Sequence, residues 1–291
     1  VCLVLLSGCS VSFDKDSAVF TCSQDPTCPS GFECVSGTCV RPENQADAME
    51  PLPCLATNHV VISEINTTPE VHEFIELANP TGSAVDLSNY YLSDNSEYPL
   101  TPAFVDGNAS PSFGLSDFIV RFPPGTTIPP GGTLLIAGNE QQFFEQYQIQ
   151  ADLGIGDLIK VQPPSGTPAF DNGSEIIVLF QWDGASDLVT DVDAVVWGNG
   201  MGLNALADKT GLMVDGPDVD AEPSSYQPDA VTATPIVPAD PLDSFQRAQG
   251  EGDQEALGSN GIDGQDETSE PLDMTWLTAA PNPGELTFCL P

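Results

Sequence analysis

The sequence predicts an all-β fold, and three features of the chain point to it. Apolar and polar residues alternate with a period of two in the segments 60–65 and 72–77, the pattern of strands that bury one face. The chain of 291 residues contains 26 Gly and 27 Pro, a content typical of many short turns. Long helical patterns are scarce. We therefore expect an antiparallel sheet that opens a β-sandwich.

The first strands are separated by turn residues. The segment 66–69, Asn-Thr-Thr-Pro, divides the strands 60–65 and 72–77, and Asn-Pro-Thr-Gly at 79–82 ends the second. We expect this second strand to bury one face and expose the other. Short strands then follow at the positions 85–87 and 90–92.

The middle of the chain supplies further strands. The segment 93–111 is expected to be a turn-rich loop, and the fully apolar run 133–137 a central strand. On the late strand 188–197, Asp191 and Asp193 alternate with an apolar residue, so we expect both to face water. The other expected strands are 117–122, 157–161 and 175–181.

One short helix is expected at 140–148. Asn139 precedes it and can accept a hydrogen bond from a backbone N–H of the first turn. Phe143, Phe144 and Tyr147 are expected to lie on one face of this helix, as core residues.

Two acidic stretches interrupt the pattern of expected strands in the late part of the chain. The segments 201–243 and 251–273 are expected to be insertions, the first partly disordered, because they are rich in acids and lack periodicity. Ser244–Arg247 returns to the sheet between them, and the closing strand is expected around Trp276.

Several blocks occur in an order that carries a resemblance to one family. They are Ile62–Ile65, Glu73–Leu77 with Asn79-Pro80, Val85–Leu87, Leu92–Asp94, Phe122–Gly138, Asp171–Gly198, Ser244–Arg247, and Trp276 followed by Pro283-Gly284. In this order they resemble a lamin-tail domain, a module found in nuclear lamins and in many bacterial secreted proteins. The resemblance covers Thr57 to Leu286 and implies an immunoglobulin-like β-sandwich.

The charge of the chain limits its partners. The formal net charge is −37, with only six Lys and Arg residues. Phosphate backbones and anionic lipid surfaces are bound through clustered basic residues. Nucleic-acid binding, a property of some lamin tails, is therefore not expected here, and basic or metal-bridged protein partners are expected instead.

The first residues resemble the end of a bacterial lipoprotein signal peptide. Residues 1–8 are mostly apolar, and Gly8 supplies the small residue that lipoprotein processing requires before Cys9. We expect Cys9 to carry the lipid, residues 9–21 to follow the anchor, and the protein to be exported to the envelope, at the outer membrane or cell surface. An ordinary signal peptide and a buried strand with two cysteines are the alternatives.

A Cys-rich module is expected at 22–40, joined by a polar linker at 41–53. Export and the small size of the module favour disulfides over zinc, whose paired C-x2-C spacing is not present. Three connectivities remain open. The cysteines are Cys22, Cys28, Cys34 and Cys39.

The remaining pair, Cys54 and Cys289, lies just outside the two ends of the resemblance, in the expected domain 54–291. The termini of a sandwich often lie close together, so we expect these cysteines to form a disulfide. Closing so long a loop stabilises a domain by about 5 kcal/mol in the chain-entropy model. Free or intermolecular cysteines are the alternative.

The sequence contains few groups suited to catalysis. His59 and His72 are the two histidines, and the motif beginning at His72 has Glu76 where a zinc protease needs its second His. G-x-S-x-G and Walker motifs are absent from the sequence. A carboxylate pair is the remaining possibility, because acids are abundant.

Calcium is the one cofactor that the residues of the sequence support with a physical argument. Asp218, Asp220 and Glu222 place carboxylates at alternate positions, and 171–175 is a second turn of that character. A solvated acidic loop explains the same residues without calcium.

A structural role is expected for Arg247 and Trp276. Arg247 is one of few cations in an acidic domain, and a bidentate pair with a neighbouring acid would fix the late strands. The sequence as a whole predicts an envelope lipoprotein that displays the sandwich as a non-catalytic interaction or scaffolding module. A calcium-dependent extracellular hydrolase and a calcium-binding adhesion protein are the competing predictions.

Overall fold

A computed structural model describes residues 33–35, 38–40, 57–110, 112–162, 169–170, 173–198, 208–220, 222–230, 235–237, 242–248 and 255–288. The chain divides into two compact units, Val1–Leu52 and Pro53–Pro291. In the first unit the described residues form an antiparallel hairpin of β1 (Glu33–Val35) and β2 (Thr38–Val40). Its backbone register places Cys34 opposite Cys39.

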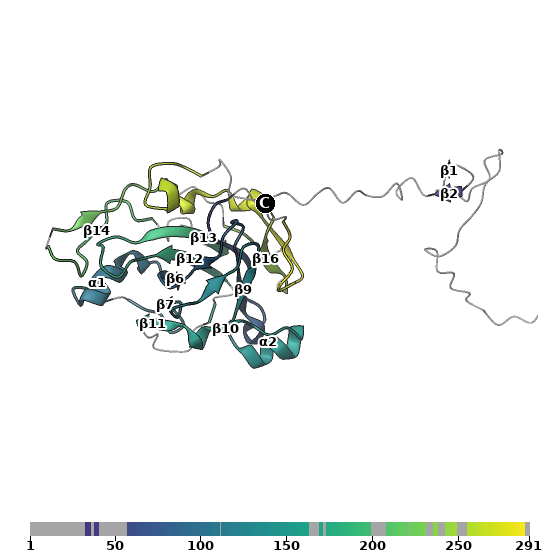
Figure 1. Ribbon diagram of the computed structural model, residues 1–291, viewed down its shortest axis with the longest axis horizontal. Helices are drawn as coiled ribbons and strands as arrows, with labels where there is room; N and C mark the ends of the chain where they lie inside the picture. Colours follow the sequence, from purple (N-terminus) through teal and green to yellow (C-terminus); the bar gives the residue numbers. More distant parts are fainter. Residues whose placement is uncertain are drawn as a thin grey trace, which may run out of the picture. The chain divides into compact units, whose positions relative to one another are not determined.

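The second unit is the all-β sandwich that the sequence predicts (Figure 1). One sheet has six strands in the order β10-β9-β4-β3-β16-β17. These strands are β3 (Val61–Asn66), β4 (Phe74–Ala78), β9 (Thr133–Ala137), β10 (Leu153–Gly154), β16 (Ser244–Arg247) and β17 (Trp276–Ala279).

The second sheet has five strands in the order β11-β7-β6-β12-β13. All of its neighbouring pairs are antiparallel. These strands are β6 (Tyr90–Ser93), β7 (Ile119–Arg121), β11 (Ile159–Gln162), β12 (Ser174–Gln181) and β13 (Thr190–Gly198).

Shorter elements complete the unit. Two small antiparallel ribbons pair β5 (Val85–Asp86) with β8 (Thr127–Ile128) and β14 (Met213–Val214) with β15 (Ser224–Ser225). The α-helices are α1 (Thr101–Asp106), α2 (Glu140–Tyr147) and α3 (Leu272–Thr275). The 3-10 helices are η2 (Glu70–His72), η3 (Tyr98–Leu100), η4 (Ile155–Asp157), η7 (Ile262–Gly264) and η8 (Glu267–Ser269).

The core lies between the two sheets and takes side chains from both. Trp197 of β13 packs on Phe245 of β16 with ring centroids 5.6 Å apart, which links the sheets directly. Tyr91 stacks on Phe180 within the five-stranded sheet, at 5.1 Å. Apolar burial of this kind is the main driving force for such a fold.

The predicted strands are confirmed, but the expectation that the second of them is half-exposed is wrong. Every residue of β4 is buried. Its outer face is covered from two sides: Phe74 packs on Phe143 of α2 with centroids 5.4 Å apart, and Ala78 lies in a buried cluster with Phe288 near the C-terminus. The period of two correctly predicts the strand, but the residues that cover its outer face lie far away in the sequence.

The segment 93–111, expected to be a loop, contains η3 and α1. Pro102 stands in the first turn of α1, where its missing N–H costs no hydrogen bond. Gly107 ends the helix with a φ of 83°, and its N–H donates to the carbonyls of Ala103 and Phe104. These are ordinary helix signals that the high turn content of the segment obscured.

The expected helix at 140–148 is confirmed as α2, with one correction. Asn139 Oδ1 accepts a hydrogen bond from the N–H of Gln142 at 3.1 Å, as expected of a cap. Phe143 is buried and Tyr147 packs beside it, but Phe144 is 37% exposed. Residues four apart share a helix face, whereas the next residue in the chain is turned away from it.

The expectation that Asp191 and Asp193 face water is also wrong, since both are only 1% exposed. The register of β12 on β13 shifts between Phe180 and Leu179, so that Val192 forms a β-bulge between the two acids. A bulge re-aims the side chains that flank it. Asp191 then meets Tyr98, and Asp193 meets the six-stranded sheet.

The described parts of the first acidic insertion pack against the sandwich. Val214, Tyr226 and Ile236 are buried and belong to the main core. The hydroxyl of Tyr226 accepts a hydrogen bond from the N–H of Val189 at 3.0 Å, beside β13. The described parts of this insertion therefore contribute side chains to the core of the sandwich.

Candidate functional site

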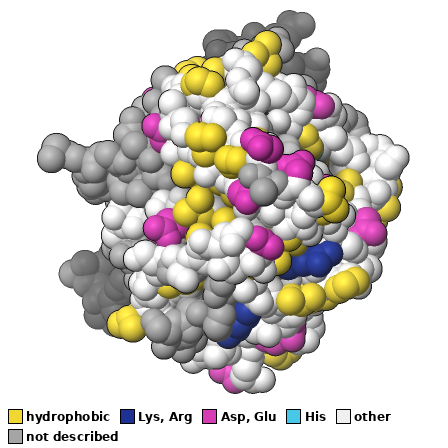
Figure 2. Space-filling view, turned by 90° about the vertical axis from the view of Figure 1, so that its left-hand side faces the viewer, with side chains coloured by type: hydrophobic (Ala, Val, Ile, Leu, Met, Phe, Trp, Pro, Cys, Tyr) yellow, Lys and Arg dark blue, Asp and Glu magenta, His cyan; other side chains and the backbone are white. Residues whose placement is uncertain are grey.

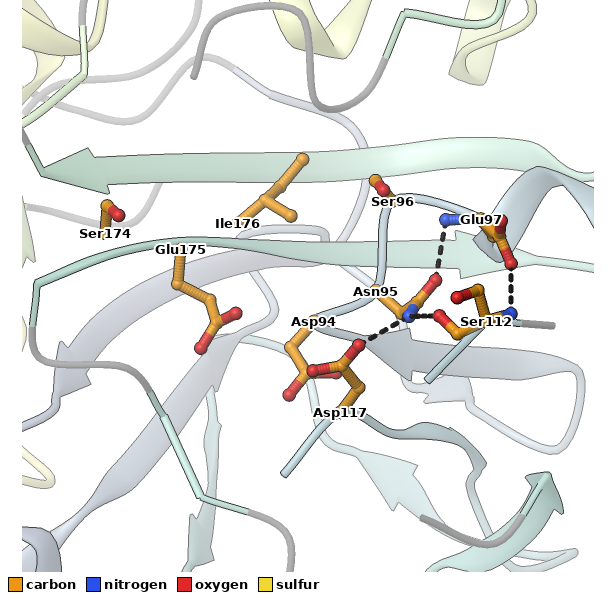
Figure 3. A pocket seen from close by; sticks show the side chains of 9 residues that line it. All are labelled: Asp94, Asn95, Ser96, Glu97, Ser112, Asp117, Ser174, Glu175 and Ile176. Atoms are coloured by element: carbon orange, nitrogen blue, oxygen red, sulfur yellow. Dashed lines mark hydrogen bonds between the residues drawn. The ribbon is translucent and has the colours of Figure 1, made fainter. Parts of the chain in front are cut away.

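An acidic pocket lies at one end of the five-stranded sheet (Figure 3). Because β6 runs antiparallel to both β7 and β12, its last residue, Ser93, lies beside Ile119 at the start of β7 and beside Val178 of β12, so that the first residues of β12 extend past the end of β6. Asp94 follows β6, Asp117 precedes β7, and Glu175 stands at the start of β12. The cavity has a volume of about 440 Å³. Its lining residues are Asp94, Asn95, Ser96, Glu97, Ser112, Asp117, Ser174, Glu175 and Ile176.

Asp94 forms the floor of this pocket and is 4% exposed. Its Oδ1 atom accepts a hydrogen bond from the N–H of Phe118 at 2.5 Å. Burial raises the pKa of Asp94 to about 9, against the opposing effect of that hydrogen bond, and the charges of Glu175 and Asp117 raise it further. Figure 3 shows Glu175 extending from β12 toward Asp94 and Asp117.

Hydrogen bonds fix the shape of the pocket wall that contains Asn95, Glu97 and Asp117. Asn95 Nδ2 donates to Asp117 Oδ2 at 2.7 Å, and Asn95 Oδ1 accepts from the N–H of Glu97 at 2.7 Å. Glu97 Oε2 in turn accepts from the N–H of Ser112 at 2.5 Å. The carboxylates thus come from segments held in place by the backbone, a preformed arrangement that suits binding.

The pocket can hold a positively charged group. Four of its nine lining residues carry carboxyl groups, and none carries a cation. Across the described part of the chain, no group of three or more His, Cys, Asp or Glu side chains is arranged to hold a metal ion. The acids of the pocket therefore surround a space and do not converge on one point.

The predicted calcium residues lie elsewhere. Asp218, Asp220 and Glu222 are exposed, and the first two accept backbone hydrogen bonds: Asp218 Oδ1 from the N–H of Asp220, and Asp220 Oδ1 from the N–H of Glu222, both at 2.9 Å. These are the local turns typical of Asp. Of the second turn, residues 171 and 172 lie outside the described residues, whereas Glu175 lines the pocket.

Arg247 is completely buried and bridges the sheets. Its Nη2 atom lies 2.7 Å and 2.8 Å from the two oxygens of Asp193, and its Nη1 atom lies 2.6 Å from Glu270 Oε1. The Nε–H donates to the carbonyl of Ile62 at 2.8 Å. Trp276 packs beside this guanidinium, with the ring centroid 4.8 Å from Cζ. Arg247 and Trp276, both predicted to be structural, thus meet in one cluster.

A second buried cluster was missed in the sequence. Lys209 Nζ lies 2.5 Å from Asp191 Oδ2 and 3.0 Å from Asp229 Oδ2, and these side chains are at most 1% exposed. Tyr98 donates to the same Asp191 oxygen at 2.9 Å. The two carboxylates raise the pKa of Lys209 although burial alone would lower it. The only signal in the sequence was a lone Lys in an acidic insertion.

Buried glutamates on β3 and β4 hold the C-terminal segment. Glu64 Oε1 accepts hydrogen bonds from Ser244 Oγ at 2.5 Å and the N–H of Asn282 at 3.1 Å. Glu76 Oε2 accepts from the N–H of Gly284 at 2.6 Å. Burial raises the pKa of Glu64 to about 7 and that of Glu73 to about 8. Strand periodicity had indicated no partner for any of these acids.

Several predicted residues lie outside the described residues or are described only by their backbone. Cys9, Cys22, Cys28, Cys54 and Cys289 belong to the first group. Cys34 and Cys39 belong to the second. The lipid site and the disulfides therefore stay predictions. In the part of the chain that is described, no helix combines the length and the hydropathy needed to span a bilayer.

Comparison with known proteins supports the resemblance over the first part of the sandwich. Residues 55–199 match the family model described as Lamin Tail Domain. This range contains the whole acidic pocket and runs from β3 to β13. The blocks at Ser244–Arg247 and Trp276, which the predicted resemblance included, lie beyond the matched range.

A solved structure is similar to the chain at a much lower level. It is described as a DUF4876 family protein from Bacteroides thetaiotaomicron VPI-5482. The identity is 13% and the TM-score 0.41, with 79% of this chain and 74% of that chain covered. No curated protein matches the chain.

Proposed function

We propose that a chain with a sandwich of the lamin-tail kind, matched over residues 55–199, uses that sandwich as a non-catalytic interaction module displayed at a bacterial cell envelope. In this proposal a lipid on Cys9 anchors the chain, and the sandwich binds a basic partner. A fold of this kind does not by itself define a function, so the argument depends on the site.

The acidic pocket is the single observation that carries the proposal. Its lining contains three serines but no His, Cys, Lys or Tyr, so no His or Lys stands in the lining to activate a serine as a nucleophile. Beside these serines and Asn95, the lining offers four carboxyl groups and their negative charge. Such a site favours holding a cationic group over transforming it.

The distribution of charge supports the same conclusion. Two of the basic residues in the described part of the chain, Lys209 and Arg247, are buried in ion pairs and contribute little to the outer surface. Figure 2 shows acidic side chains dispersed over one face, with basic side chains in small patches only. With a net charge of −37, the protein attracts cationic partners over several ångströms and speeds their association.

The envelope part of the proposal is supported by sequence alone. The apolar residues before Cys9 and the small Gly8 fit a lipoprotein signal, and the cysteines of 22–40 fit an oxidising compartment. Acyl chains on Cys9 bind a bilayer with about 0.8 kcal/mol for each buried methylene.

Labelling cells with a fatty-acid analogue tests the anchor. The wild type is expected to incorporate the label and Cys9→Ala to lose it. An unlabelled wild type would exclude the anchor while leaving the binding role of the sandwich open.

Cross-linking on intact cells tests the binding role. The full chain is expected to form defined cross-linked products that a Glu97→Gln, Asp117→Asn, Glu175→Gln triple variant does not form. The matched control removes three exposed charges outside the pocket, at Glu70, Glu145 and Asp273. Equal products from both triple variants would contradict a role for the pocket.

A hydrolase that uses calcium is the competing function, and one observation favours it. Asp94 is a buried carboxyl with a raised pKa beside other acids, a pattern also found in general acids. A screen of the purified protein against phosphoesters, esters and glycans, with and without Ca²⁺, separates the two functions. Turnover that Asp94→Asn abolishes would replace the proposal.

A further inference from the structure

The floor of the acidic pocket contains a buried carboxyl oxygen without a hydrogen-bond partner among the described residues. Asp94 Oδ1 is satisfied by the N–H of Phe118, but Asp94 Oδ2 is buried and has no hydrogen-bond partner among the described residues. Buried polar atoms in folded proteins nearly always have a partner, so an orphaned one in a pocket points to a group that binds there.

The surroundings of Asp94 define the charge of that group. Asp117 faces it from the segment before β7, Glu175 from β12, and Glu97 lies in the same wall after β6. Both Asp117 and Glu175 act on Asp94 electrostatically. The negative charge of these neighbours favours a positively charged ligand, which can donate hydrogen bonds to Asp94 Oδ2 once the proton of Asp94 has left.

The spacing of the acids decides between a metal ion and an organic cation. Calcium needs six to eight oxygens within about 2.6 Å of one point. No three acids in the described ranges are grouped in that way, and the cavity of about 440 Å³ is far larger than one ion. A guanidinium group instead presents five N–H donors spread over a plane, which matches acceptors on separate walls.

We propose that the pocket takes the side chain of an arginine from a partner protein, with the guanidinium group paired to Asp94 Oδ2 at the floor and to Asp117 and Glu175 at the sides. This inference rests on the proposed function and names the part of the partner that the module recognises. Bidentate Arg–carboxylate pairing is directional and stronger than pairing with a neutral donor.

The protonation state of Asp94 gives this binding a measurable property, the release of a proton. Because burial raises its pKa to about 9, Asp94 holds a proton near pH 7 in the unbound protein. The guanidinium must displace this proton. Binding is therefore expected to release about one proton near pH 7 and to tighten by up to about tenfold for each pH unit between 7 and 9.

Calorimetric titration of the full-length protein with a capped peptide, acetyl-Gly-Arg-Gly-amide, tests the inference. The neutral citrulline peptide is the ligand control. Repeating the titration in buffers of different ionisation enthalpy gives the number of protons released. The arginine peptide is expected to bind with proton release, and the citrulline peptide to show no binding.

Variants assign the binding to the pocket. Asp94→Asn keeps an Oδ1 acceptor for Phe118 and is expected to lower the affinity by about 30-fold or more and to abolish proton release. Glu175→Gln is expected to weaken binding without abolishing proton release, and Glu145→Gln, an exposed acid on α2, to change neither. Thermal melts check that Asp94→Asn is folded; if it is not, Glu175→Gln carries the test.

Other results would overturn the inference. These are no binding of the arginine peptide, equal binding by Asp94→Asn, equal binding of the corresponding lysine peptide, or CaCl2 that binds and displaces the peptide. If the peptide fails but pocket-dependent cross-linking on cells persists, the module still binds a partner and only the arginine assignment falls.

Discussion

Arg247 on β16 meets Asp193 on β13 with both carboxylate oxygens within 2.8 Å of its Nη2 atom, and this pair joins the two sheets of the sandwich. Asp193 Oδ2 also accepts from the N–H of Ile62 on β3 at 2.6 Å. Glu270 supplies a second carboxylate to the same guanidinium. Four segments that are distant in the sequence thus meet at one buried cation.

Replacing Arg247 by Met should strongly destabilise the domain. The change leaves Asp193 and Glu270 buried without their cation, and breaking a buried pair in this way typically costs about 3 to 5 kcal/mol. Urea unfolding measures the loss. Lys160→Met, which removes an exposed cation from β11, should cost less than about 0.5 kcal/mol. Similar midpoints for the two variants would mean that Arg247 is not structural.

A second prediction concerns the acidic insertion. Lys209→Met should destabilise the sandwich by about 3 kcal/mol or more, because Asp191 and Asp229 lose the cation they share. If the pairing is direct, Lys209→Met and Asp191→Asn together should cost less than the sum of the single changes. Additive losses in this cycle would show that Lys209 stabilises the fold without acting through Asp191.

Strand periodicity predicted most of the fold but not which faces are covered. The alternation in β3, β4 and β13 predicted the correct strands, but it did not predict the bulge at Val192 that separates Asp191 from Asp193. Periodicity shows which residues share a face, not what lies against that face. The partners Lys209 and Arg247 lie 18 and 54 residues away from their acids, and no local pattern connects them.

The acidic pocket could not be predicted from the sequence, for a related reason. Asp94 belongs to the segment 93–111, predicted to be a loop, and Glu175 to the turn 171–175, predicted as a weak calcium candidate. Only the strand order β7-β6-β12 brings them together with Asp117. With 43 Asp and Glu residues in the chain, no acid is distinctive before the topology is known.

The predicted disulfide between Cys54 and Cys289 is open to a direct measurement. Peptide mapping under non-reducing conditions should recover one cross-linked fragment that contains both residues. Reduction should then destabilise the domain by about 5 kcal/mol in the chain-entropy model. The double variant with Ser at both positions should show no further change on reduction. Recovery of the two cysteines as free thiols would exclude the pair.

The stability of the domain should fall as the pH rises from about 5 to 9. Burial raises the pKa of Glu64 to about 7, of Glu73 to about 8 and of Asp94 to about 9. Between the unfolded and folded pKa values, the folded protein holds protons that the unfolded chain has lost. Each such proton lowers the free energy of unfolding by about 1.4 kcal/mol per pH unit, so this contribution is complete at low pH and is lost toward alkaline pH.

Urea unfolding at pH 5, 6, 7 and 8 measures this slope, and Glu64→Gln identifies one of its sources. A glutamine cannot titrate, yet it keeps an oxygen for Ser244 and the N–H of Asn282. The variant should therefore show a flatter pH dependence between about pH 5 and 7, whereas Glu145→Gln on the surface should follow the wild type. Asp86 and Asp183, whose pKa values are lowered by hydrogen bonds from Ser88 and Ser186, act in the opposite sense but only at more acidic pH. A stability that rises from pH 5 to 8 would contradict the buried, proton-holding state of these acids.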